Sequence, residues 1–103
     1  MNQTSPEPSD EIAARFVSHV IGISEQALVF LGQVPHPVTK KQELNLDFAR
    51  EMIDTLAMLE AKTKGNLGVE ESQVMREVLT SLRLAYAEVS ARPDAEAAPA
   101  PPA

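Results

Sequence analysis

The chain has 103 residues, no cysteine, and 9 basic against 15 acidic side chains, which gives a formal net charge of −6. Its length corresponds to a single domain. The lack of cysteine excludes disulfides, thiolate nucleophiles and cysteine-ligated metal centres. The acidic balance argues against nucleic acid as a partner, because neutralising phosphates requires clustered lysine and arginine.

The two ends of the chain differ from its middle. Residues 1–9 contain prolines and lack both the basic start and the apolar stretch of a signal peptide. Nine of the eleven residues from Pro93 to Ala103 are alanine or proline. Such a composition has little to bury, so we expect disordered segments at 1–9 and 93–103 around a helical domain at 10–92.

The longest apolar region gives no membrane-spanning segment. It runs from Phe16 to Val34 and is interrupted by His19, Glu25 and Gln26, whereas a spanning helix needs about 18 to 20 predominantly apolar residues. We therefore expect a soluble protein, and a cytoplasmic one because no signal peptide precedes it. Binding to a membrane surface is disfavoured, since Arg15 is the one basic residue of the first helix and anionic lipids repel an acidic chain.

The first predicted helix covers Ser9 to Val34. Its apolar residues recur every three or four positions, the spacing of a helix rather than a strand. Ser9 is the expected N-cap, since Asp10 and Glu11 follow it and favour the positive end of a helix. The segment Pro35-His36-Pro37 is expected to end the helix.

Two further helices are predicted, and no strand. One covers Asn45 to Lys64, with Gly65 as the left-handed residue after its end. The other covers Gly68 to Ala91, with acidic residues in its first turn and Pro93 after its end. The fold class is therefore all-α, as a three-helix bundle or as a helical hairpin plus a long helix.

The first helix has more apolar surface than two small neighbours would cover. Val17, Ile21 and Leu28 widen its apolar stripe to roughly half of the circumference, at about 100° per residue. Exposed, these side chains would favour association. We therefore predict a homo-oligomer, most simply a two-fold dimer, with these three residues in the interface. The alternative is that this helix is the central, most buried element of one bundle.

Neither histidine has the neighbours of a metal ligand, so we expect no metal, cofactor or catalytic residue. His19 borders the apolar stripe and is expected to be partly buried. His36 lies between two prolines and is expected to be a solvated turn residue.

Two acidic features belong to the second helix. Glu43, Asp47, Glu51 and Asp54 share one side, which is interpreted as a solvated face; a hard cation or a basic partner is the alternative. Glu60 instead falls within the apolar arc, so its carboxylate must either be paired or lie at the edge of the arc; pairing is favoured, and Lys64 and Arg83 are the candidate partners.

The segment from Lys62 to Gly68 is the one candidate ligand site. Two lysines, a glycine turn and the free amides of a helix start can hold a phosphate or carboxylate. The candidate residues are Lys62, Lys64, Gly65, Asn66 and Gly68. The segment has no P-loop pattern, and a helix C-cap followed by the next N-cap explains the same residues.

The same segment carries a family resemblance. The run Lys62-Thr63-Lys64-Gly65-Asn66-Leu67, with the flanking apolar positions from Phe16 to Val89, resembles a bacterial family known as domain of unknown function 1844. Gly68 departs from the Thr or Ser common there, which removes a side-chain cap. The resemblance implies a small, all-helical, cytoplasmic bacterial protein and no reaction.

Two functions remain open from the sequence. The first is a non-enzymatic helical module that self-associates through its first helix and presents the acidic face of its second helix, or the Lys-Thr-Lys-Gly-Asn turn, to a further, unidentified protein. The second is a protein that binds a small anion or phosphorylated metabolite at the Lys-Thr-Lys-Gly-Asn turn.

Overall fold

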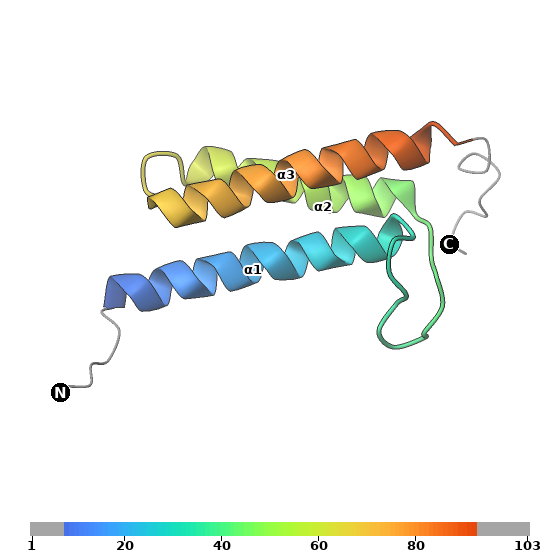
Figure 1. Ribbon diagram of the computed structural model, residues 1–103, viewed down its shortest axis with the longest axis horizontal. Helices are drawn as coiled ribbons and strands as arrows, with labels where there is room; N and C mark the ends of the chain where they lie inside the picture. The colour runs from blue at the N-terminus through green and yellow to red at the C-terminus, as the bar shows by residue number, and fades with distance from the viewer. Residues whose placement is uncertain (1–7, 93–103) are drawn as a thin grey trace.

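The computed structural model describes residues 8–92 and contains three helices. They are α1 (Pro8–Phe30), α2 (Leu46–Lys62) and α3 (Val69–Ser90). Figure 1 shows α1 and α3 side by side, with α2 behind them, and each helix contacts both others. The predicted all-α three-helix bundle is confirmed. The predicted disordered segments lie outside the described residues, apart from Pro8 and Ser9.

The core lies along the axis between the three helices. Each helix contributes one apolar stripe, as the spacing of three and four predicts. The largest side chains with almost no exposed surface come from all three helices and from the residue after α1: Val20, Leu31, Leu56, Met75, Leu79, Leu82 and Val89. The one buried polar side chain among the described residues is Ser24, whose hydroxyl donates to the carbonyl oxygen of Ile21 at 2.8 Å. Its burial therefore leaves no hydrogen bond unmade.

The start of α1 differs slightly from the prediction. The helix begins at Pro8, so Ser9 is its second residue and not its N-cap. Proline suits the first helical position, because its fixed φ is already helical and its missing N–H would have no partner there.

The end of α1 was predicted wrongly. The helix stops at Phe30, four residues before Val34 and well before the prolines. Gly32 adopts a left-handed φ of +75°. The N–H of Gly32 donates to the carbonyl oxygen of Val29 at 3.0 Å, and that of Gln33 donates to the carbonyl oxygen of Leu28 at 2.9 Å. These two bonds form a Schellman motif, so the glycine ends the helix before the prolines can.

The connection from α1 to α2 is fastened at both ends. Leu31 and Leu44 form an isolated antiparallel bridge, and the N–H of Asn45 donates to the carbonyl oxygen of Phe30 at 2.8 Å. His36 stabilises the loop of this connection. Its Nδ1 accepts from the N–H of Val38 at 3.1 Å, and its ring lies edge-on to Phe30, with centroids 6.4 Å apart. His36 is thus half-buried and bonded, where a solvated turn residue was predicted.

The ends of α2 are capped by side chains. The Asn45 side-chain oxygen accepts from the N–H of Phe48 at 3.1 Å, which satisfies one amide of the first turn. At the other end the Thr63 hydroxyl donates to the carbonyl oxygen of Leu59 at 2.6 Å. Gly65 is left-handed, as predicted, with φ +88°. It is the second residue after the C-cap, Thr63, whereas the sequence predicted it to be the first.

A tight turn joins α2 to α3. It is closed by the N–H of Asn66, which donates to the carbonyl oxygen of Thr63 at 2.8 Å. Gly68 is the N-cap of α3, and its N–H donates to the Glu71 carboxylate at 2.6 Å. The second half of the turn, at Asn66 and Gly68, lies beside the start of α1.

Candidate functional site

The turn residues predicted to hold an anion do not surround one space. Lys64 and Gly65 line a hollow between α2 and α3. Asn66 and Gly68 line a second hollow, between the turn and the start of α1. Lys62 lines neither of these hollows. The turn therefore places the five predicted anion-binding residues on different surfaces and does not bring them together around one ligand.

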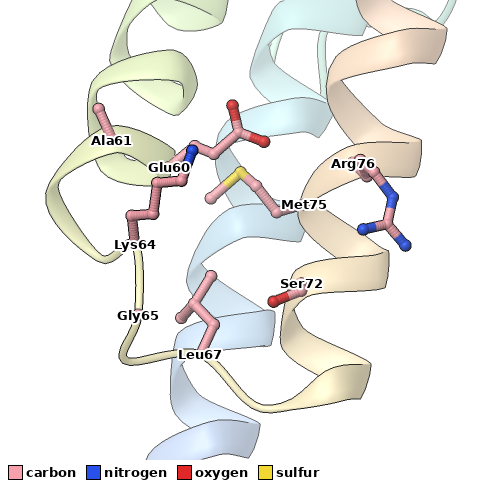
Figure 2. A pocket seen from close by; sticks show the side chains of 8 residues that line it. All are labelled: Glu60, Ala61, Lys64, Gly65, Leu67, Ser72, Met75 and Arg76. Carbon is pink, nitrogen blue, oxygen red and sulfur yellow. The ribbon is translucent and has the colours of Figure 1, made fainter.

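Figure 2 shows the hollow between α2 and α3. Its volume is about 440 Å³, large enough for a small metabolite. Leu67 and the buried Met75 form its apolar wall, and the carboxylate of Glu60 points across it toward α3. The Arg76 guanidinium, the second cation of the hollow, is turned away from the Lys64 amine in this view. The two cations therefore do not converge on one ligand.

The start of α3 already holds a carboxylate. Glu71 accepts from the N–H of Gly68 at 2.6 Å, and Glu70 stands beside it in the first turn. Negative side chains near a helix start stabilise its positive end. An added anion at these amides would meet both carboxylates, so the geometry favours the capping interpretation of this turn.

Three other predicted features are placed as follows. Glu60 is half-buried at the mouth of the hollow, and within the described residues no lysine or arginine lies within 4.0 Å of its carboxylate, so the predicted pairing is not formed. His19 is exposed, where partial burial was predicted, because α1 turns it away from the core. The acidic row on α2 is exposed at Asp47, Glu51 and Asp54, and Asp54 lies 3.9 Å from Arg50.

The predicted interface residues lie on one side of α1. Val17 and Leu28 are half-buried, and Ile21, between them in the sequence, is 38% exposed. Val17 lines the hollow beside the α2–α3 turn, and Leu28 lines another hollow between α1 and α3. One side of α1 thus borders open space along most of its length.

Helix α3 supplies the opposite border, which sequence reasoning missed. Val69 lines the hollow near the turn, and Glu77, Val78 and Ser81 line the one farther along. Leu84 lies two turns after Glu77, on the same side of the helix. Val69 and Leu84 are 84% and 61% exposed. Both lie outside the main apolar arc of α3. Apolar residues outside that arc can be identified from the sequence alone, so this signal for a second border was available.

We call this surface the α1–α3 face. It consists of the residues lining the two hollows between α1 and α3, together with Ile21 and Leu84. Its apolar members are Ile12, Ala13, Ala14, Val17, Ile21, Leu28, Val69, Val78, Leu82 and Leu84.

Within residues 8–92, no group of three or more histidine, aspartate or glutamate side chains is placed to hold a metal ion. In the same part of the chain, no helix is both long enough and apolar enough to cross a membrane.

The sequence also matches a family model described as "Domain of unknown function (DUF1844)", over residues 13–88. The chain belongs to this family. The match covers all of α2, all but the first five residues of α1 and all but the last two residues of α3. It thus includes both borders of the α1–α3 face. No curated protein and no solved structure matches the chain.

Proposed function

We propose that this protein is a non-enzymatic protein-interaction module that buries its α1–α3 face against a helix. The observation that supports this proposal is the pair of hollows between α1 and α3, with apolar side chains exposed around them. Ile12, at 68% exposed, and Val69 flank the hollow nearest the turn. Contiguous apolar surface on a small protein is typical of an interaction site.

The polar groups of the described residues support an interaction role over a catalytic one. Several of their hydroxyls are engaged with the backbone of their own helices: Ser24 with Ile21, Thr63 with Leu59, and Ser90 with Ala87. A nucleophile needs a base within hydrogen-bond reach, and none of these three hydroxyls bonds to one. The Thr39 hydroxyl does donate to the Glu43 carboxylate, at 3.3 Å, but this pair lies in the exposed connection between α1 and α2 and lines neither hollow of the α1–α3 face. The two hollows between α1 and α3 therefore offer apolar surface to a partner, and not a set of reactive side chains directed at one point.

A small anion held by the Lys-Thr-Lys-Gly-Asn turn is the less favoured alternative. Its residues are divided between two hollows, and the Gly68 amide already has an acceptor. A titration with inorganic phosphate, followed by amide resonances, tests it. Shifts at Lys64 and Gly65 that vanish in Lys64→Ala, but persist in Lys62→Ala, would support anion binding.

The interaction role is tested by photocrosslinking in the native cell. A photoreactive amino acid replaces one residue of α1 at a time. A docked helix predicts adducts at Ala14, Val17 and Ile21, with a period of three to four residues, and none at Arg15 or His19. Met58, which is 48% exposed on α2, serves as the control for an exposed apolar position.

The mass of the adduct identifies the occupant. The sequence predicts a two-fold dimer through Val17, Ile21 and Leu28, which would give an adduct of twice the chain mass. Another mass indicates a different protein. If adduct yields at all positions on α1 equal the yield at Met58, the interaction role is wrong.

A further inference from the structure

The α1–α3 face has the length and the lining of a groove for one helix. One hollow lies beside Val17 and Val69, and the other lies beside Leu28 and Leu82; Ile21 lies between them on α1. The eleven-residue step from Val17 to Leu28, which lie on the same side of α1, corresponds to about 16 Å, or about three helical turns. Small side chains, among them Ala13, Ala14 and Ser81, line the two hollows and leave room for another backbone to approach.

Every charged side chain that lines the two hollows is acidic. Asp10, Glu70 and Glu71 line the hollow near the turn, and Glu77 lines the one farther along. No lysine or arginine lines either of them. An apolar floor with acidic borders is complementary to a helix that has one apolar side flanked by lysine or arginine.

The charge of the chain's own helices disfavours a second copy as the occupant. Three acidic residues and one basic residue give α1 a net charge of −2, and four acidic and two basic residues give α2 and α3 the same value. Docking any of these helices against Glu70 and Glu77 would place like charges together. Like charges across an interface weaken association.

We infer that the α1–α3 face binds a basic amphipathic helix of another protein. The inference rests on the proposed function and specifies the partner. The apolar side of that helix packs between Val17 and Val78, and its lysines or arginines lie against Glu70 and Glu77. The net charge of −6 adds long-range attraction, which speeds encounter with such a partner.

The test uses a fluorescent peptide of about 18 residues, with leucine and alanine on one side of the helix and lysine on both flanks. A control peptide has glutamate in place of each lysine. Binding to the full chain is measured by fluorescence anisotropy at about 0.05 M and about 0.3 M NaCl, since salt screens exposed charges. We expect the lysine peptide to bind, and to bind more weakly at the higher salt, while the glutamate peptide does not bind.

Two charge-reversal variants separate a site from general attraction to an acidic protein. Glu70→Lys with Glu77→Lys changes the face, whereas Asp47→Lys with Glu51→Lys makes the same change of net charge on α2. Glu70 and Asp47 both stand in the first turn of a helix, so the cost at the helix end is matched. We expect about a tenfold loss of affinity or more from the first pair. The second pair should lose much less, and equal losses would overturn the inference.

Two variants that replace an apolar residue by aspartate test the apolar floor of the α1–α3 face. Ile21→Asp places a charge at its centre, and Met58→Asp places one on α2, away from the face. Both positions are partly exposed, so the bundle is expected to fold, and thermal melting of each variant checks this. Ile21→Asp should reduce peptide binding about tenfold or more, and Met58→Asp should leave it unchanged.

Sedimentation equilibrium of the chain alone separates this inference from the proposed function. A dimer that Ile21→Asp dissociates, together with no binding of the lysine peptide, would overturn the basic partner and leave the interaction role standing. Equal binding of the lysine and glutamate peptides would also overturn it. Loss of the position-dependent crosslinks would instead overturn the proposed function itself.

Discussion

The rings of Phe30 and Phe48 meet edge to face, with centroids 4.6 Å apart and planes at 88°. Phe30 is the last residue of α1 and Phe48 lies in the first turn of α2, so the pair joins two helices across a fifteen-residue connection. Asn45 adds to the same junction by donating to the carbonyl oxygen of Phe30. The ring contact and this hydrogen bond together hold the end of α1 against the start of α2.

The Phe30–Phe48 contact should show as a coupling energy in urea denaturation. Replacing each residue by leucine, singly and together, is expected to give an interaction energy of about 0.5 to 1.5 kcal/mol. Phe16, which packs on the core without stacking on Phe48, provides the matched cycle with Phe48. A coupling for Phe16 and Phe48 as large as that for Phe30 and Phe48 would contradict a role for the ring contact.

Gly32→Ala should destabilise the chain by about 1 to 2 kcal/mol, because its φ of +75° places a Cβ against the following carbonyl oxygen. The surroundings are not the obstacle, since the nearest atom to such a Cβ is 3.7 Å away. Gly22 is the control. It lies inside α1 with open space around it, so Gly22→Ala should stabilise by about 0.5 to 1 kcal/mol. Two changes of the same sign would argue against the Schellman end of α1.

Replacing methionine by alanine should lower the free energy of unfolding far more at Met75 than at Met58. Met75 is 1% exposed and packs in the core, so Met75→Ala is expected to cost about 2 to 5 kcal/mol of the free energy of unfolding. Met58 is largely outside the core, and Met58→Ala should change stability by less than about 0.5 kcal/mol. Chemical denaturation of both variants measures the difference, and a cost at Met58 close to that at Met75 would place the core elsewhere.

Gly68→Ser should stabilise α3 by about 0.5 kcal/mol, since it adds a side-chain cap and restricts the unfolded chain. The φ of −71° suits serine, and the new Cβ would come to 3.2 Å from the Glu71 carboxylate, which is able to shift. Gly68→Ala has the same Cβ without the hydroxyl. If alanine stabilises as much as serine in thermal melting, the gain is not due to capping.

The sequence by itself determined the three helices and most of their limits. Spacing of three and four identifies the stripes that become the core, and local capping chemistry places Asn45 and Gly68 next to helix starts. The left-handed turn at Gly65 follows from the same local rules. These features depend on neighbours along the chain, so the sequence contains the information that they need. The end of α1 could have been predicted for the same reason, because Gly32 is a local signal for a helix end. The prediction relied on the prolines that follow it instead.

Tertiary structure alone decided what each helix presents to the others and to solvent. Periodicity gives the apolar side of α1, but not how far α2 and α3 cover it, so it could not show that His19 is exposed and Ile21 only partly covered. It could not place Lys64 and Asn66 on different hollows either, since a tight turn sends neighbouring side chains to opposite sides. The acidic borders of the α1–α3 face come from Asp10 on α1 and from Glu70, Glu71 and Glu77 on α3, which follow it by 60 residues or more. Only the rotation of those helices about their own axes, fixed by packing, brings these residues onto one surface.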